Sequence, residues 1–473
     1  MFNTRPVLAP KQKALQINLD KDIYGTFSEI GAGQETVRYF FRVGAASNTI
    51  AKAISAYDKD FSDALYGKEP NNRYVSQSRL LKILDYEIKV IEDRISRESC
   101  PGRKFFSYAN TVTTINFDKT SKGHGWVGIR FQLNELEPYN EIILHVRFHE
   151  NDAKLQQETL GILGVNLIYG AFYYAENPKV IIESLYDELN TDQIEIDMIN
   201  FSGPRYAYLD NRLMSLQLVK NGMTDAVVFE PNGKNVLAAD ELYKKNILAL
   251  RGSFRPVTNV NIDIYKRGLK MFMEEDQVTE QNTKILFEIT LSNLRAKGEI
   301  NERDFLDRAD ILGKLGHTVL ISNFSEYYRL VDYFSRFTSE KIRISMGVNN
   351  LLDVFQEEYY TNLSGGIMEA FGKLFKKQLK IYLYPYIDQE TNKILTSDTL
   401  RVSEELKDLY KYFKKNNWIV DMLEYDESYL KIYGKQILAQ IIMGEPDWEN
   451  QVPKEVAEMI KERGMFGFSR RLK

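Results

Sequence analysis

Cysteine is almost absent from the 473-residue sequence, since Cys100 is the only one. An intramolecular disulfide and a thiolate-rich metal site are therefore excluded. Neither sign of charge predominates, because 62 Lys and Arg residues stand against 66 Asp and Glu residues, for a net charge of −4. This balance gives no electrostatic footprint for nucleic acid or an anionic membrane as a partner. The sequence also has no P-loop, HExxH pair, GxSxG elbow or kinase signature.

Long hydrophobic runs are missing as well. The longest uncharged run includes residues 160–175, a stretch of 16 residues that contains Asn166, whereas a membrane-spanning helix needs about 20 apolar residues. This run predicts a buried core helix. The first 20 residues contain no apolar stretch of the signal-peptide type. Together with the single cysteine, this predicts a cytoplasmic protein.

The composition that is present, 44% hydrophobic and 27% charged residues, is typical of a folded globular protein of two or three domains. The hydrophobic pattern changes near residue 155. We expect an N-terminal α+β domain over residues 1–155, in which helices precede an antiparallel meander. A domain of repeated β-α units is expected over residues 156–473.

The meander is predicted from apolar residues that alternate with others in residues 127–133 and 140–150, as in half-buried strands. Residues 108–117 are expected to form a third strand of the same sheet. Three of the four histidines fall in this meander. His145 and His149 share one face of a strand but lie ~13 Å apart along an extended chain, too far to chelate one ion. We therefore expect solvated side chains and no metal site. His124, in a glycine-rich turn, is placed to reach a neighbouring site.

The C-terminal pattern alternates short apolar runs with amphipathic helical segments. Such alternation predicts parallel strands joined by helical crossovers. Eight repeats predict a closed, TIM-like β/α barrel, and the alternative is an open doubly wound sheet. The eight strand-like runs begin at residues 194, 225, 246, 284, 317, 341, 379 and 418.

Charged side chains would point into such a barrel. In three of the strands, the apolar residues would face the surrounding helices. The residues that alternate with them would then face the barrel interior, and these include Asp197, Glu288, Arg343 and Ser345. Asp197 and Glu288 are candidate acid–base catalysts, since an enclosed carboxylate can have its pKa raised toward neutrality. The alternative is a core ion-pair network closed by Arg343.

Polar residues also collect where the predicted strands end, which is where α/β proteins bind ligands. The segment "LRGSFRPVT" (residues 250–258) carries two guanidinium groups, each suited to a phosphate or carboxylate. The alternative is that these residues form turns and helix N-caps. The candidate substrate-binding residues are Asn200, Ser202, Arg251, Ser253, Arg255, Asn293, Asn323 and Asn349.

Five stretches carry a resemblance to a known family: "GTFSEIGAGQETVRYFF", "ETLGILGVNLIYGAF", "NRLMSLQLVKNGMTDAVVF", "NILALRGSFRPVT" and "FGKLF". With them the chain resembles a bacterial protein family of about this length, whose members often bear the label nicotinate-nucleotide adenylyltransferase. The label implies a motif Gly-[Ser/Thr]-Phe-Asp-Pro-x-His-x-Gly-His that contacts nucleotide phosphates.

Part of this motif is present in the first of these stretches. Ser28 and Glu29 stand where the motif has Asp and Pro, and Gly31 and Gln34 stand where it has its two histidines. Glycine cannot stabilise charge on a phosphate, and glutamine supplies only a neutral donor. A dinucleotide fingerprint is also incomplete, because Thr36 stands where its third glycine belongs. The resemblance assigns nucleotide binding to Gly25, Thr26, Gly33 and Gln34.

Three functions follow as expectations. The first is an enzyme that binds a phosphorylated or nucleotide-like small molecule at the carboxyl ends of its strands. The second is the adenylyl transfer that the family label implies. The third is a non-catalytic, self-assembling or regulatory protein, since 29 Tyr and 26 Phe residues supply material for a homo-oligomer surface. The sequence names no cofactor.

Overall fold

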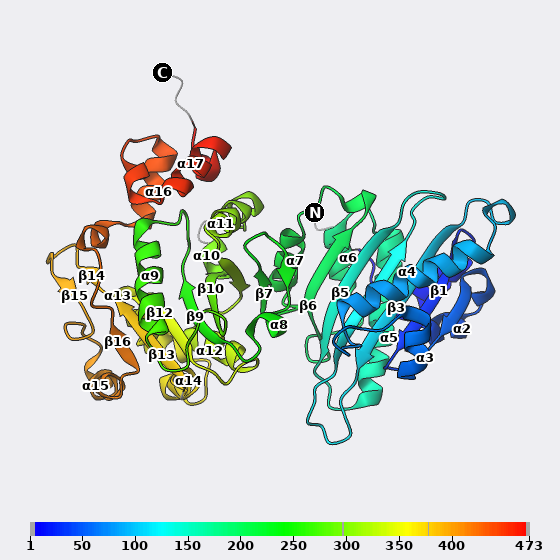
Figure 1. The fold of residues 1–473 in the computed structure, drawn as a ribbon, viewed down its shortest axis with the longest axis horizontal. Coiled ribbons are helices and arrows are strands. Elements are labelled where there is room, and N and C mark those ends of the chain that lie inside the picture. The colour runs from blue at the N-terminus through cyan, green and yellow to red at the C-terminus, as the bar shows by residue number, and fades with distance from the viewer. Residues whose placement is uncertain (1–4, 296–297, 377, 470–473) are drawn as a thin grey trace. The chain divides into compact units, whose positions relative to one another are not determined.

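The computed structural model describes residues 5–295, 298–376 and 378–469 (Figure 1). The chain forms two compact units, Met1–Asp225 and Ala226–Lys473. The predicted boundary after residue 155 falls inside the first unit. Residues that follow it, such as Leu163 and Ile196, belong to the same hydrophobic core as Phe27.

The first unit is built on a six-stranded mixed sheet with the order β2-β1-β3-β4-β5-β6. β1 pairs in parallel with β2 and β3, and the remaining neighbours are antiparallel. The predicted meander is confirmed as β3-β4-β5. The strands are β1 (Ile23–Ile30), β2 (Ile50–Ile54), β3 (Lys104–Thr113), β4 (His124–Phe131), β5 (Asn140–Phe148) and β6 (Ile194–Ser202).

Helices supply the rest of this unit's core. The predicted core helix is confirmed as α5, whose Leu163, Leu167 and Ile168 are fully buried. Within the described residues, no helix combines the length and apolar character needed to cross a bilayer. The helices are α1 (Pro10–Leu19), α2 (Glu35–Val43), α3 (Lys59–Tyr66), α4 (Gln77–Arg94), α5 (Ala153–Tyr173), α6 (Pro178–Ser184) and α7 (Asn211–Lys220).

The second unit is built on an eight-stranded sheet with the order β16-β13-β12-β9-β10-β11-β7-β8. The strands from β16 to β11 are parallel, and β7 and β8 are antiparallel. The strands are β7 (Ala226–Phe229), β8 (Asn235–Val236), β9 (Asn246–Arg251), β10 (Thr283–Thr290), β11 (Thr318–Ser322), β12 (Ile342–Gly347), β13 (Leu379–Tyr384) and β16 (Ile419–Asp421). A separate hairpin joins β14 (Tyr386–Ile387) and β15 (Ile394–Leu395).

The predicted closed barrel is wrong, because the sheet ends at β8 on one side and at β16 on the other. The alternative, an open sheet, describes the unit. All eight strand-like runs form strands, but the run at residue 194 is β6 and belongs to the first unit's sheet. Along the chain, β10 and β11 are added on one side of β9, and β12, β13 and β16 on the other. The strand order therefore reverses between β9 and β12, which is the topological switch point of a doubly wound sheet.

Helices cover both faces of this sheet (Figure 1). On one face, Phe334, Phe371 and Phe413 of α12, α14 and α15 join the core. On the other, Tyr265 of α9 packs against Phe287 of β10. The helices are α8 (Ala238–Leu242), α9 (Asn259–Met273), α10 (Leu291–Arg295), α11 (Glu302–Lys314), α12 (Tyr327–Ser335), α13 (Val348–Val354), α14 (Gly366–Leu374), α15 (Lys407–Lys415), α16 (Gly434–Met443) and α17 (Lys454–Arg463).

Candidate functional site

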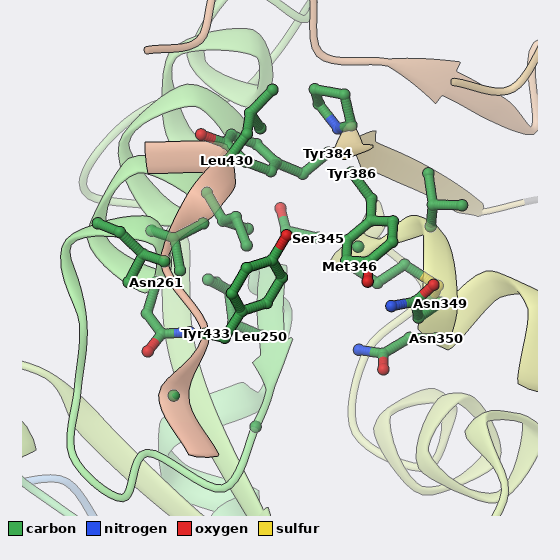
Figure 2. Close-up of a pocket in the computed structure, with 18 of the residues that line it drawn as sticks. Leu250, Asn261, Ser345, Met346, Asn349, Asn350, Tyr384, Tyr386, Leu430 and Tyr433 are labelled. Atoms are coloured by element: carbon green, nitrogen blue, oxygen red, sulfur yellow. The ribbon is translucent and has the colours of Figure 1, made fainter. Parts of the chain in front are cut away.

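A cavity of about 580 Å³ opens at the carboxyl ends of β9, β12 and β13 in the second unit (Figure 2). It lies at the switch point between β9 and β12, where open α/β sheets bind ligands. Its volume is within the range of small-molecule sites, roughly 300–1,000 Å³. We call it the switch-point cavity.

Three parts of the unit line this cavity. The first is the end of β9 with the start of α9, the second is the turn from β12 into α13, and the third comprises the segments around Tyr386 and Tyr433. Among the described residues that line it, none carries a carboxylate. The cations are Arg251 and Lys435, and the side-chain amides are Asn261, Asn349, Asn350, Gln389 and Gln436.

Arg251, predicted to grip an anion, lines the cavity but is engaged by Glu288. Its Nε and Nη2 donate to the two Glu288 oxygens at 2.7 and 3.0 Å, and Nη1 donates to the Ser325 carbonyl oxygen at 3.0 Å. The Ser322 hydroxyl donates to the same carboxylate at 2.6 Å. Glu288 is completely buried. Three of the five guanidinium N–H groups are therefore engaged, and Glu288 balances the charge of Arg251.

The other predicted residues of the second unit have different neighbours. Arg255 forms an ion pair with Asp304. Asn293 donates its backbone N–H to the Thr290 hydroxyl at 3.1 Å, a turn contact of the kind the alternative interpretation describes. Ser253 is exposed and, like Asn323, does not line the switch-point cavity. Of the predicted binding residues, Arg251 and Asn349 line it.

Asp197, Asn200 and Ser202 belong to β6, in the first unit. The prediction that Asp197 and Glu288 share one interior is therefore wrong, because their strands lie in different sheets. Asp197 accepts from Nδ1 of His145 at 2.6 Å and from Nε of Arg147 at 2.7 Å. Burial acts to raise the pKa of Asp197, but these two partners outweigh it and lower the pKa to about 2.

The prediction of a solvated side chain is wrong for His145, since only 2% of it is exposed, whereas His149 is exposed. The Nε2 of His145 lies 3.3 Å from Nδ1 of His124, which is the first residue of the adjacent strand β4 rather than part of a turn. Burial, followed by the nearby His145 and Arg147, lowers the pKa of His124 to about 4. Within the described residues, no group of three or more His, Cys, Asp or Glu side chains is arranged to hold a metal ion.

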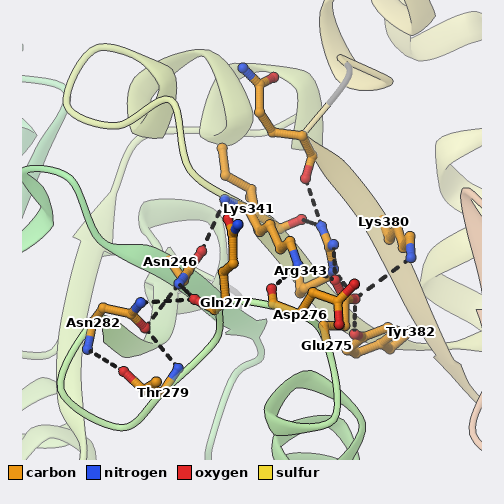
Figure 3. Close-up of polar contacts among 12 residues, drawn as sticks. Asn246, Glu275, Asp276, Gln277, Thr279, Asn282, Lys341, Arg343, Lys380 and Tyr382 are labelled. Atoms are coloured by element: carbon orange, nitrogen blue, oxygen red, sulfur yellow. Dashed lines mark hydrogen bonds and ion pairs between the residues drawn. The ribbon is translucent and has the colours of Figure 1, made fainter.

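The predicted ion-pair network of Arg343 has other members (Figure 3). Arg343 pairs with Glu275 instead of Asp197 or Glu288, and its Nε donates at 2.6 Å. The Tyr382 hydroxyl donates to the same carboxylate at 2.5 Å. Burial acts to raise the pKa of Glu275, but the hydrogen bonds from Arg343 and Tyr382 lower it to about 2. Arg343 lies near the amino end of β12, and like Glu275 and Tyr382 it does not line the switch-point cavity.

The glycine-rich segment after β1 does end at a helix, but the helix terminus is already occupied. Glu29 accepts from the backbone N–H groups of Thr36 and Val37 at 3.1 and 2.8 Å, in the first turn of α2. These are the donors that would cradle a phosphate. Burial raises the pKa of Glu29 to about 7, against the opposing effect of these N–H groups.

The residues that the resemblance assigns to a nucleotide lie around this terminus. Gly25 is required by packing, because a Cβ there would overlap Phe106. Gly33 has a φ of 74°, which favours glycine. Thr26 is buried in β1, and Gln34 precedes α2 without capping it through its side chain. Nucleotide binding by this segment stays a prediction.

The comparisons with known proteins are limited to structural likeness. No protein-family model and no curated protein matches the chain. A competence-damaged protein (CinA) superfamily structure from Enterobacter cloacae is 11% identical, covering 36% of this chain and 96% of its own, with a TM-score of 0.27. A competence or damage-inducible protein from Enterobacter asburiae is 13% identical over 34% of this chain and 95% of its own, with a TM-score of 0.25. At such scores neither match carries an argument about function.

Proposed function

We propose that the second unit binds a phosphorylated or nucleotide-like small molecule in the switch-point cavity. The observation that supports this most directly is the position of the cavity at the reversal of strand order, combined with a lining of two cations and five side-chain amides. An anionic ligand is favoured there by complementary charge, and the amides can orient it through hydrogen bonds.

Lys435 is the residue we assign to the anionic group of the ligand. It is exposed at the start of α16, whereas Arg251 is paired with Glu288 and has three of its five N–H groups engaged. The proposal concerns binding and does not include catalysis. Asp197 lies in the other unit, and Glu288 is held by Arg251 and Ser322, so acid–base work by either carboxylate stays a prediction, as does self-assembly.

The test measures ligand binding by the full chain with isothermal titration calorimetry and thermal melting, using nucleoside monophosphates, ribose 5-phosphate and inorganic phosphate. Lys435→Ala is compared with Lys431→Ala, which removes an exposed lysine outside the cavity lining. We expect binding by the wild type and by Lys431→Ala, and binding weakened about 3- to 10-fold in Lys435→Ala, as for a charge at the rim of a site. Absence of binding by every probe, or equal binding by both variants, would overturn the proposal.

A further inference from the structure

Ser345 occupies an unusual position on the wall of the switch-point cavity. It lies near the end of β12, only 2% of it is exposed, and it lines the cavity. Its hydroxyl has no hydrogen-bond partner among the residues that the structure describes. Leaving a buried hydroxyl unpaired costs about 1–3 kcal/mol. Such a group is expected to pair with something that enters the cavity.

The fold makes room for this hydroxyl without satisfying it. The residue of α9 that faces it is Gly268, and a Cβ at that position would overlap the Ser345 Oγ. Within the sheet, Ser345 lies beside the apolar Leu250 of β9 and beside Tyr382 of β13. The Tyr382 hydroxyl already donates to Glu275. The Ser345 hydroxyl thus has no hydrogen-bond partner from its own sheet or from α9.

Aromatic side chains lie around the same space (Figure 2). Tyr386 and Tyr433 are both partly exposed, and their ring centroids lie 6.3 Å apart with the planes at 75°. Phe254 lines the cavity from the loop after β9. Aromatic side chains can stack against flat rings, and such stacking contributes about 1–3 kcal/mol to binding for each nucleic-acid base.

We infer that the ligand carries a planar, nitrogen-containing ring, as a nucleoside monophosphate does, and that Ser345 selects this ring by hydrogen-bonding to its edge. The ring packs against Tyr386 and Tyr433, and its anionic group lies toward Lys435. This inference rests on the proposed function and adds the chemical class of the ligand and a residue that determines specificity.

The experiment compares AMP, GMP, CMP and UMP with ribose 5-phosphate by isothermal titration calorimetry of the full chain. We expect at least one nucleotide to bind about 10-fold more tightly than ribose 5-phosphate, from stacking and one hydrogen bond. Ser345→Ala should weaken the binding of that nucleotide about 3- to 10-fold and leave the affinity for ribose 5-phosphate unchanged. The control is Ser339→Ala, an exposed serine outside the cavity lining, which should change neither.

The outcomes separate the inference from the proposed function. If ribose 5-phosphate binds as tightly as every nucleotide, the ring is not recognised and the inference fails while the proposed function stands. If a nucleotide is preferred but Ser345→Ala binds it unchanged, the assignment of Ser345 is overturned. If none of the probes binds, both the inference and the proposed function are overturned. The Ser345→Ala variant should keep the fold, since it removes no hydrogen bond seen in the structure.

Discussion

Arg251 and Glu288 lie opposite each other on the neighbouring strands β9 and β10, and the guanidinium donates to both carboxylate oxygens. Glu288 is completely buried, and 9% of the Arg251 side chain is exposed. The sequence suggested Glu288 as a catalyst and Arg251 as an anion-binding residue. In the structure the two form an ion pair, and their charges neutralise each other. Lys435 is thus the lining cation whose charge this carboxylate does not balance.

Removing one member of this pair should cost more than removing both. Glu288→Leu leaves a buried arginine without its carboxylate, and we expect the free energy of unfolding to fall by about 3–5 kcal/mol. The double variant Arg251→Met/Glu288→Leu leaves no uncompensated charge and should lie close to the wild type. Urea denaturation measures both. Equal losses in the single and double variants would contradict this account.

Glu29 should make the first unit less stable as pH rises. Its pKa is raised to about 7 in the folded chain, from a usual value of 4.5. A carboxyl with a raised pKa is protonated more readily in the folded state, so its favourable contribution is present at low pH and is lost between about pH 4.5 and 7.

The measurement for Glu29 compares the wild type with Glu29→Gln, a neutral side chain of similar shape. The free energy of unfolding of the variant minus that of the wild type should increase by on the order of 3 kcal/mol between pH 5 and pH 8. Denaturation at a series of pH values gives this difference. If it does not change with pH, the carboxyl titrates normally and the N–H groups of Thr36 and Val37 hold it ionised.

Glu275 should show the opposite dependence on pH. Arg343 and Tyr382 lower its pKa to about 2 in the folded chain, from 4.5. Its contribution to stability is present above about pH 4.5 and is lost as the pH falls toward 2. Glu275→Gln should therefore be less stable than the wild type at pH 7 by on the order of 3 kcal/mol, with the difference closing toward pH 2. A constant difference across this range would show that the ion pair contributes nothing.

Gly268 should be intolerant of a methyl group only while Ser345 is present. Gly268→Ala places a Cβ against the Ser345 Oγ, and overpacking of this kind costs about 1–3 kcal/mol. In a Ser345→Ala background the clash is relieved, and alanine is the better helix former by about 1 kcal/mol. Thermal or urea denaturation of the four proteins tests this coupling. Additive effects would show that the two residues do not meet.

Local patterns in the sequence were enough to identify most strands. The alternation in residues 127–133 and 140–150 predicted β4 and β5, the run at residues 108–117 predicted β3, and all eight apolar runs of the second pattern form strands. Successive side chains of a strand point to opposite faces, so a half-buried strand has an apolar residue at every second position. This pattern can be recognised within a single segment. The long uncharged run likewise predicted α5, because its length and apolar character are properties of one segment.

The candidate site was only partly accessible from the sequence. Arg251 and Asn349 lie at strand ends and do line the cavity. Ser345 was expected inside a closed barrel, which the open sheet rules out, although it too lines the cavity. Tyr386, Tyr433 and Lys435 were missed. They lie in or beside irregular segments after β13 and β16, where no periodic signal marks a residue as facing a cavity.

The sequence by itself determined which segments become strands and helices, because hydrophobic periodicity acts within a few residues of chain. Only the tertiary structure decided that β6 joins the first sheet, that β9 lies between β10 and β12, and that the second sheet stays open. It also decided which charges meet, as in the pairing of Glu288 with Arg251 and of Arg343 with Glu275. These outcomes depend on hydrogen bonds and ion pairs between residues far apart in the chain, and such pairings leave no local pattern in the sequence.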